Sequence, residues 1–301
     1  IAPSYTFVST VNSFVIRGAK PIFIDIKMDT LNMDENSIES LITKKTKAII
    51  PVHYAGVGCE MDKILDISRK YNIPVVEDNA HGLFAKYKDK YLGTFGTFAT
   101  QSFHETKNYS CGEGGALLIN DNKYINRAEI IREKGTNRKM YHDGEVDKYS
   151  WQDIGSSYLP SDILSAILYT QFNDRKKIQK KRKTIYNYYY NHLVDWAHEN
   201  RVLLPTVPGS CEQSYHMFYM IMPTLKKRNF FLNILNDAGI KSIFHYVPLH
   251  TSKMGLKFGN KKGDLPVTEK VSDCLIRLPF FNDISYSQLK YVVEIILSCK
   301  L

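Results

Sequence analysis

The stretch that decides the fold is residues 47–78, KAIIPVHYAGVGCEMDKILDISRKYNIPVVED, in which a helix-like segment separates two short apolar runs. Within 60–71 the apolar residues recur at the spacing of one helix face, whereas 47–52 and 74–76 are short runs that favour strands. Two strands joined by a helix within about 30 residues are typical of a parallel sheet covered by helices. This stretch therefore predicts an α/β fold.

The same alternation extends outward from this stretch through the first part of the chain. The expected elements are strands at 21–26, 97–103 and 116–119, helices at 34–42, 124–134, 161–172 and 173–199, and a long polar loop at 135–149. We assign residues 1–175 to one large domain with a mostly parallel sheet and helices on both faces.

The pattern changes after Pro205 and Pro208, which interrupt the chain. The expected elements beyond them are strands at 215–222 and 242–246 and helices at 229–238, 268–276 and 285–298. Strands and helices of this order favour an α+β layer. We therefore expect a second, smaller domain at residues 176–301.

The composition narrows the class of protein. Hydrophobic residues make up 44% of the 301 residues and charged residues 24%, as in ordinary soluble proteins. No apolar run approaches the roughly 20 residues of a membrane span. The five scattered cysteines favour a reducing cytoplasm, and no histidine or cysteine spacing indicates a metal site. The net charge of +9 is spread along the chain, which favours a lysine-rich surface over nucleic-acid binding and also suits a phosphorylated small substrate.

Two groups of polar residues follow predicted strands, where ligands of open parallel sheets bind. Asp78 comes after the apolar run at 74–76, and a carboxylate there suits a protonated pyridine nitrogen; alternatively, it caps the next helix. Ser102 ends the strand at 97–103, and Lys107 follows five residues later. Their hydroxyl and amine suit a phosphate and an aldehyde, although an isolated lysine is more often a surface residue.

A set of short stretches, spread over essentially the whole chain, resembles the nucleotide-sugar aminotransferases of fold type I, the DegT/DnrJ/EryC1/StrS family. The stretches occur in the order and spacing of that family: PSYTFVST at 3–10, PVHYAG at 51–56, VEDNAH at 76–81, SFHETKN at 102–108, EGG at 113–115, SD at 161–162 and HYVPLH at 245–250. One such motif is weak, but a collinear series is specific. The resemblance implies the pyridoxal 5′-phosphate (PLP) transferase fold of type I, with a smaller α+β domain at the C-terminus.

The resemblance also implies roles for individual residues. Lys107 matches the Schiff-base lysine, which is bound covalently to PLP, and Asp78 matches the partner of the pyridine nitrogen. Phe7 and Ala80 match the residues against the two faces of the cofactor ring. Ser102 matches a ligand of the cofactor phosphate.

The resemblance also implies roles for residues that stand in less specific motifs. His81 falls where the family has glutamine or histidine beside the phenolic oxygen of the cofactor. Ser157 lies in a segment that reaches the cofactor phosphate of the neighbouring subunit, where the family more usually has asparagine. His245, Tyr246 and His250 lie in a segment that lines the sugar-nucleotide pocket in relatives. Because family sites are shared between subunits, we expect at least a homodimer.

Within the family, residues 103–108, 132–138 and 153–159 are most similar to the enzymes that form dTDP-4-amino-4,6-dideoxygalactose for surface polysaccharides such as lipopolysaccharide and enterobacterial common antigen. The resemblance implies transfer of the amino group of L-glutamate to the 4-keto carbon of dTDP-4-dehydro-6-deoxy-D-glucose. A 3-keto or UDP-linked sugar and a truncated, non-catalytic homologue remain alternatives. Relatives that deoxygenate sugars replace the lysine by histidine, so Lys107 argues against that chemistry.

Family members carry about 70 further residues before the position of Pro3, including a Ser/Thr-rich turn at a helix N-terminus that binds the cofactor phosphate. No stretch of the 301 residues matches this turn. We therefore expect the N-terminal part of the large domain to lie outside this sequence.

Overall fold

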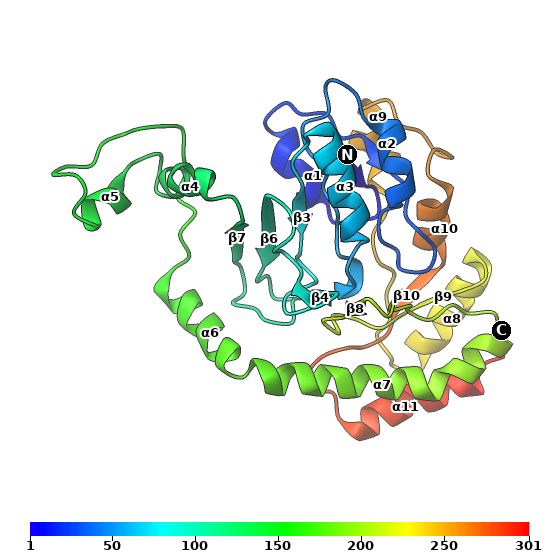
Figure 1. The fold of residues 1–301 in the computed structure, drawn as a ribbon. Coiled ribbons are helices and arrows are strands. Elements are labelled where there is room, and N and C mark those ends of the chain that lie inside the picture. Colours follow the sequence, from blue (N-terminus) through cyan, green and yellow to red (C-terminus); the bar gives the residue numbers. More distant parts are fainter. Residues whose placement is uncertain (301) are drawn as a thin grey trace.

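A computed structural model describes residues 1–300 and shows an α/β architecture (Figure 1). The central sheet begins with β1 (Ala2–Pro3), which pairs in parallel with β2 (Phe23–Ile24). On the other side of β1, the backbone N–H of Ile50 donates to the carbonyl of Ile1 at 2.8 Å. The extended residues around Ile50 thus continue the sheet beyond β1.

The sheet continues through β3 (Val76–Asp78): Asp78 bridges in parallel to Val52, and Val75, just before β3, bridges in parallel to Ile49. On its other side, β3 pairs in parallel with β6 (Phe98–Ser102). The last strand, β7 (Gly115–Ile119), runs antiparallel to β6. The sheet is therefore mostly parallel, which confirms the predicted fold class.

Helices cover both faces of this sheet because neighbouring strand residues point in opposite directions. Ala2, Phe23 and Ile50 form one apolar cluster with Val11 of α1 (Val8–Val15). The residues beside them in sequence, Ile1, Ile24 and Ile49, belong to a different cluster, with α2 (Ile38–Leu41) and α3 (Met61–Tyr71). A small sheet of β4 (Lys86–Tyr87), β5 (Lys90–Tyr91) and β8 (Cys211–Glu212) lies next to these elements.

The segment of residues 125–173 forms an arm that stands away from the sheet (Figure 1). It contains α4 (Ile125–Arg132), α5 (Arg138–His142) and α6 (Asp162–Asn173). None of the residues in these three helices is buried. The arm therefore contributes little to the core.

The long helix α7 (Arg175–Glu199) leads from the arm to the C-terminal part of the chain. There α7 packs with α8 (Leu225–Asp237) and α11 (Tyr286–Ser298) around the antiparallel pair β9 (Tyr219–Ile221) and β10 (Leu275–Arg277). The remaining elements are α9 (Lys253–Lys257), α10 (Pro266–Cys274) and 3₁₀ turns at Glu35–Ser37, Tyr54–Gly56, Asn122–Tyr124 and Leu249–Thr251. A further apolar cluster, which contains Tyr5, Tyr54, Met217 and Tyr219, joins the two parts of the chain.

The structure corrects some of the predicted elements. The expected loop at 135–149 contains α5, whose short turn is supported by an ion pair between Lys139 and Asp143 at 2.8 Å. The expected strand at 242–246 is reduced to a single bridge between Ile243 and Arg277. Helix α1 was not predicted, because its β-branched residues have weak helix propensity and packing on the sheet decides its conformation.

Within residues 1–300, no helix combines the length and the apolar character that a membrane crossing requires. The division at residue 175 remains a prediction about domains.

Candidate active site

Adjacent parallel strands bring the predicted site residues to one edge of the sheet. Asp78 is the last residue of β3 and Ser102 the last residue of β6, and Asp78 lies opposite Thr100 in the register. After β6 the chain turns sharply, and the backbone N–H of Lys107 donates to the carbonyl of His104 at 2.9 Å. Lys107 therefore lies beyond the carboxyl end of the sheet, where α/β proteins bind their ligands.

Asp78 is held by two hydrogen bonds. Its Oδ2 accepts from the hydroxyl of Thr10 at 2.6 Å, and its Oδ1 accepts from the backbone N–H of Ala80 at 3.1 Å. Because Thr10 gives its only hydroxyl proton to the carboxylate, the hydroxyl of Thr6 donates to Thr10 at 2.8 Å. These bonds fix the direction of the carboxylate and leave lone pairs for a further donor.

Lys107 is half-buried, and the surroundings of its amine favour the neutral form. Burial lowers the pKa of Lys107; the nearby Asp78 opposes this effect, whereas the positive charge of Arg277 adds to it. Among residues 1–300, no side chain accepts a hydrogen bond from the amine or forms an ion pair with it. The amine is therefore available to a ligand.

A small cavity adjoins Lys107 and contains several of the predicted residues. Its lining residues are Ala80, His81, Leu83, Ser102, Lys107, Asn108, Tyr109 and His216. Four of these were candidates from the sequence, namely Ala80, His81, Ser102 and Lys107. The fold therefore brings together residues from the ends of both β3 and β6.

Three buried histidines stand beside this cavity. The ring of His81 stacks on that of His216 with 4.1 Å between centroids and lies 6.1 Å from that of His245. Burial is the main cause that holds the pKa of each well below 6.5, and the nearby cations Lys107 and Arg277 act in the same direction. All three rings are therefore neutral at physiological pH.

The tautomer of His81 follows from its neighbours. Its Nδ1 accepts from the backbone N–H of Ala55 at 3.3 Å, so its proton is on Nε2. That nitrogen lies 3.3 Å from the hydroxyl of Tyr246 and donates to it. In turn, Nδ1 of His245 lies 2.6 Å from the hydroxyl of Tyr54. His81 with Tyr246 and His245 with Tyr54 are thus two hydrogen-bonded pairs, which stacking of the rings of His245 and Tyr246, 3.7 Å between centroids, brings together.

Other predicted residues lie outside these pairs. Phe7 is 57% exposed, and its ring centroid is 6.3 Å from that of Tyr246. Ser157 is exposed in the arm, where its backbone bridges to Glu133. Both ring nitrogens of His250 are engaged, with Ser4 at 2.7 Å and with Glu269 at 3.0 Å. Within this chain, the structure does not bring Ser157 or His250 to the cavity.

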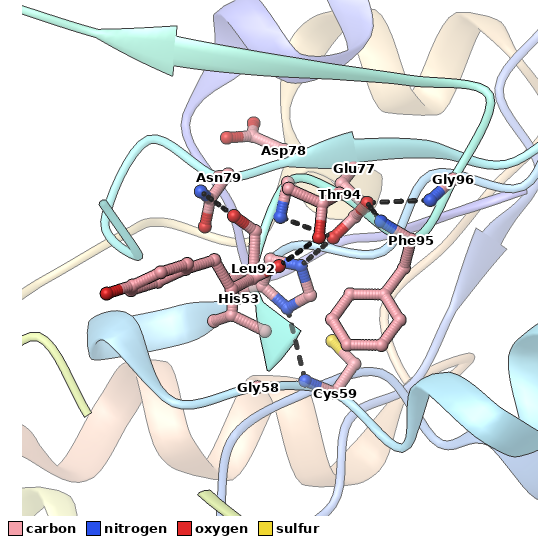
Figure 2. Close-up of polar contacts among 12 residues, drawn as sticks. His53, Gly58, Cys59, Glu77, Asp78, Asn79, Leu92, Thr94, Phe95 and Gly96 are labelled. Atoms are coloured by element: carbon pink, nitrogen blue, oxygen red, sulfur yellow. Dashed lines mark hydrogen bonds and ion pairs between the residues drawn. The ribbon is translucent and has the colours of Figure 1, made fainter. Parts of the chain in front are cut away.

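A buried carboxylate lies directly behind Asp78 (Figure 2). Glu77 points to the opposite side of β3 and accepts from Nε2 of His53 at 2.9 Å. It also accepts from the backbone N–H groups of Gly93, Phe95 and Gly96, each at 2.7 Å. Burial alone would raise the pKa of Glu77, but these hydrogen bonds outweigh it and lower the pKa. Glu77 thus anchors the turn before β6 to the strand that carries Asp78.

The arrangement fits PLP. Asp78 offers an oriented carboxylate to a protonated ring nitrogen, and Lys107 offers an amine with a lowered pKa and no competing acid partner to an aldehyde. Ala80, whose backbone N–H donates to Asp78, lines the same small cavity as Lys107. Such a site can bind a cofactor covalently and move a proton beside it.

Sequence reasoning missed Thr10, His216 and Arg277. Thr10 is separated from Asp78 by 68 residues, and His216 and Arg277 come from the C-terminal part of the chain. None stands in a local motif that indicates a contact with the strand ends.

Comparison with known sequences places these features in a family. The sequence profile of the DegT/DnrJ/EryC1/StrS aminotransferase family matches residues 1–297. An uncharacterized protein of Methanocaldococcus jannaschii is 36% identical over 288 residues, which cover 93% of this chain and 74% of that protein. A pleiotropic regulatory protein of Geobacillus stearothermophilus is 33% identical over 298 residues, covering 98% of this chain and 76% of that protein.

Solved structures agree with the sequence relatives. A putative sugar aminotransferase of Streptococcus pneumoniae in its PMP form has a TM-score of 0.89 and 25% identity, covering 99% of this chain and 80% of that one. A Helicobacter pylori aminotransferase involved in pseudoaminic acid biosynthesis has a TM-score of 0.87 and 25% identity, covering 98% and 78%. The chain belongs to the DegT/DnrJ/EryC1/StrS aminotransferase family, a family of sugar aminotransferases whose cofactor is PLP.

Proposed function

We propose that this protein transfers the amino group of L-glutamate to the 4-keto carbon of dTDP-4-dehydro-6-deoxy-D-glucose, giving dTDP-4-amino-4,6-dideoxy-D-galactose. The observation that carries the proposal is the pair formed by Asp78 and Lys107 at neighbouring strand ends, with the amine of Lys107 unpaired. The particular sugar rests on the similarity of residues 103–108, 132–138 and 153–159 to enzymes that make this product.

Each residue of the site has a proposed part in this reaction. When bound, PLP supplies an electron sink beside the carbon that loses or gains a proton. The amine of Lys107 binds the cofactor and afterwards moves that proton, and its lowered pKa increases the fraction of neutral amine able to accept it. The carboxylate of Asp78, oriented by Thr10, holds the proton on the ring nitrogen.

The remaining candidates position the cofactor and the sugar. Ser102 is proposed as a donor to the cofactor phosphate, and Phe7 and Ala80 as the residues on its two faces. His81, with its proton on Nε2, is proposed to lie beside the phenolic oxygen. His245, Tyr246 and His250 are proposed to line the sugar-nucleotide side; for His250 this requires release of Ser4 or Glu269.

The decisive experiment replaces Lys107 by alanine. Lys107→Ala is expected to lose the visible absorbance of the bound cofactor and to lower amino transfer by at least about 10²-fold, the usual contribution of a positioned acid–base group. The matched control is Lys123→Ala, because Lys123 is an exposed lysine paired with Asp121. A yellow, active Lys107→Ala protein would remove Lys107 from this role. Wild-type protein that never binds PLP would instead support a non-catalytic homologue.

The substrate needs its own assay. With glutamate as the amino donor, the enzyme is offered dTDP- and UDP-linked sugars that carry the keto group at C3 or C4. The proposal expects the highest kcat/KM for dTDP-4-dehydro-6-deoxy-D-glucose, with the axial amine of the galacto product identified by NMR. A higher kcat/KM for a 3-keto or UDP-linked sugar would show that the proposed substrate is wrong, although amino transfer itself would stand.

We also propose that the protein acts as a homodimer or a larger homo-oligomer in the cytoplasm, with Ser157 reaching the cofactor phosphate of the neighbouring subunit. The arm that carries Ser157 exposes large apolar side chains, with Trp151 79% exposed and Ile163 74% exposed. Apolar surface of this kind favours association. All five cysteines are free, which supports a reducing compartment.

A mixing experiment tests the shared site. Lys107→Ala and Ser157→Trp homodimers are each expected to be inactive, whereas co-refolded mixtures contain heterodimers in which one of the two sites has both native residues. Mixtures should therefore regain activity. If sites are not shared, each site of a heterodimer keeps its own defect and mixing restores nothing.

A further inference from the structure

The imidazole of His216 has a tautomer that its neighbours define. Its Nδ1 lies 2.9 Å from Oδ1 of Asn108, and the Nδ2 group of Asn108 donates to the carbonyl of Ser214 at 2.8 Å. The amide of Asn108 is therefore oriented with its oxygen toward the histidine. Because an amide oxygen can only accept, the proton of His216 is on Nδ1 and a lone pair is left on Nε2.

The lone pair of His216 has no partner among residues 1–300, although the ring is buried. Nε2 itself is not fully enclosed, so its lone pair can accept a hydrogen bond from a group in the cavity that His216 lines. His216 lines the same small cavity as Lys107, and Lys107 is close enough to lower the pKa of His216. Among the described residues that line this cavity, the amine of Lys107 and the hydroxyl of Ser102 are side-chain donors without an acceptor in the chain.

We propose that His216 is a positioning residue for Lys107: the two groups line one cavity without a bond between them in this structure, and a rotation of the lysine side chain lets its amine donate a hydrogen bond to Nε2 of His216 when the amine is not bound to the cofactor. This inference rests on the proposed function, in which Lys107 alternates between a bound and a released amine. After release, the hydrogen bond keeps the amine beside the cavity and orients its remaining lone pair. Asn108 directly follows Lys107 in the chain and contacts Nδ1 of His216, so the turn that carries Lys107 is held next to the histidine.

The stacking of His216 on His81 offers a structural role as the competing explanation. Phenylalanine preserves a flat ring for stacking but has no acceptor. Glutamine preserves an acceptor oxygen but has no ring. The pair His216→Phe and His216→Gln therefore separates the two roles.

The charged and titratable groups around Lys107 come from several elements. Asp78 on β3 favours the ammonium, Arg277 on β10 disfavours it, and the three neutral histidines His81, His216 and His245 carry no charge. Loss of a neutral acceptor removes stabilisation of the ammonium more than of the amine, because hydrogen bonds to charged groups are the stronger ones. The pKa of Lys107 should then fall.

The test labels Lys107 in cofactor-free protein with trace acetic anhydride across a pH series, with the extent at Lys107 read by peptide mass spectrometry. His216→Phe is expected to move the labelling midpoint down by about one pH unit, which corresponds to one hydrogen bond to a charged group. His216→Gln should restore the midpoint to within a few tenths of a unit. A midpoint in His216→Phe equal to that of the wild type would overturn the proposal.

A second measurement leaves His216 in place and so does not depend on the folding of a His216 variant. In the ¹⁵N NMR spectrum of cofactor-free protein, Lys107→Met should shift Nε2 of His216 toward the value of a free lone pair and leave Nδ1 in place. An unchanged Nε2 shift would contradict the contact. Both measurements use cofactor-free protein, so they remain separate from the question of whether the enzyme transfers an amino group.

Discussion

Two regions of the molecule differ in how many contacts their side chains make within the chain. Around Glu77, four donors converge on one buried carboxylate, and every donor comes from this chain (Figure 2). The arm at 125–173 buries almost nothing of its own and exposes Trp151, Ile163 and Tyr169, the last being 68% exposed (Figure 1). The first region is complete within one chain, whereas the second has apolar surface that nothing in residues 1–300 covers.

We infer from this difference that the Glu77 region provides rigidity, whereas the arm serves the proposed assembly. The Glu77 network fixes the strand end that carries Asp78, so the position of Asp78 does not depend on the arm. The arm carries Ser157, whose proposed partner belongs to another subunit. Changes in the first region should therefore lower stability, and changes in the second should lower association.

The largest expected effect is the loss of Glu77. Glu77→Ala leaves the backbone N–H groups of buried Gly93 and Gly96, that of half-buried Phe95 and the N–H of His53 without an acceptor, and it should lower the free energy of unfolding by about 3–5 kcal/mol. Urea denaturation measures the change. The matched control is Glu39→Ala, which removes an exposed ion pair with Lys70 and should cost less than about 0.5 kcal/mol. Equal losses for the two variants would contradict the special role of the network.

The neutral histidines predict the response to acid. His81, His216 and His245 have pKa values held well below 6.5 by burial, so the unfolded chain binds more protons than the folded one below that pH. The contribution of these histidines to the free energy of unfolding is present above pH 6.5 and is lost as the pH falls. From pH 6.5 to 5.5 the loss should be about 1 kcal/mol for each histidine, or about 3 kcal/mol together.

The matched control for the acid response is His192, an exposed histidine on α7. His192→Gln should leave the dependence of unfolding free energy on pH unchanged. A constant unfolding free energy between pH 6.5 and 5.5 in the wild type would mean that the three rings can take up protons without unfolding.

A substitution of Trp151 tests the arm at 125–173. Trp151→Ala should weaken self-association by about 2 kcal/mol, or roughly 30-fold, the effect of an aromatic anchor in an interface. The stability of the subunit should hardly change, because Trp151 is 79% exposed within the chain. Sedimentation measures the association constant, with Tyr286→Ala, a 69% exposed tyrosine on α11, as the control. A dimer as tight as the wild type would exclude this part of the arm from the interface.

The smallest expected effect concerns the contact that orients Asp78. Thr10→Val keeps the shape of the side chain and removes the hydroxyl that donates to Oδ2 at 2.6 Å. The expected cost is about 1.5 kcal/mol, either in unfolding free energy or as a roughly tenfold weaker binding of PLP. Thr10→Ser, which keeps the hydroxyl, should retain most of the unfolding free energy and most of the affinity for PLP. Wild-type values for Thr10→Val would show that Ala80 alone is sufficient to orient the carboxylate.

The sequence predicted most of the fold because periodicity depends on local residues. The helix expected at 60–71 is α3, and the strands expected at 97–103 and 116–119 are β6 and β7, each shifted at most by one or two residues. The strand expected at 74–76 extends as β3 through Asp78, because backbone pairing with β6 continues beyond the apolar run. Weakly periodic segments such as α1 were missed, since only their packing makes them helical.

By itself, the sequence determined the α/β class, the family and the two residues, Asp78 and Lys107, that stand in collinear motifs. Only the tertiary structure decided that Thr10 orients Asp78, that His216 stacks on His81 and that Arg277 lies near Lys107. The physical reason is that periodicity and motifs are properties of neighbours in the chain. The protonation and direction of a side chain depend instead on groups that meet only when distant segments pack together.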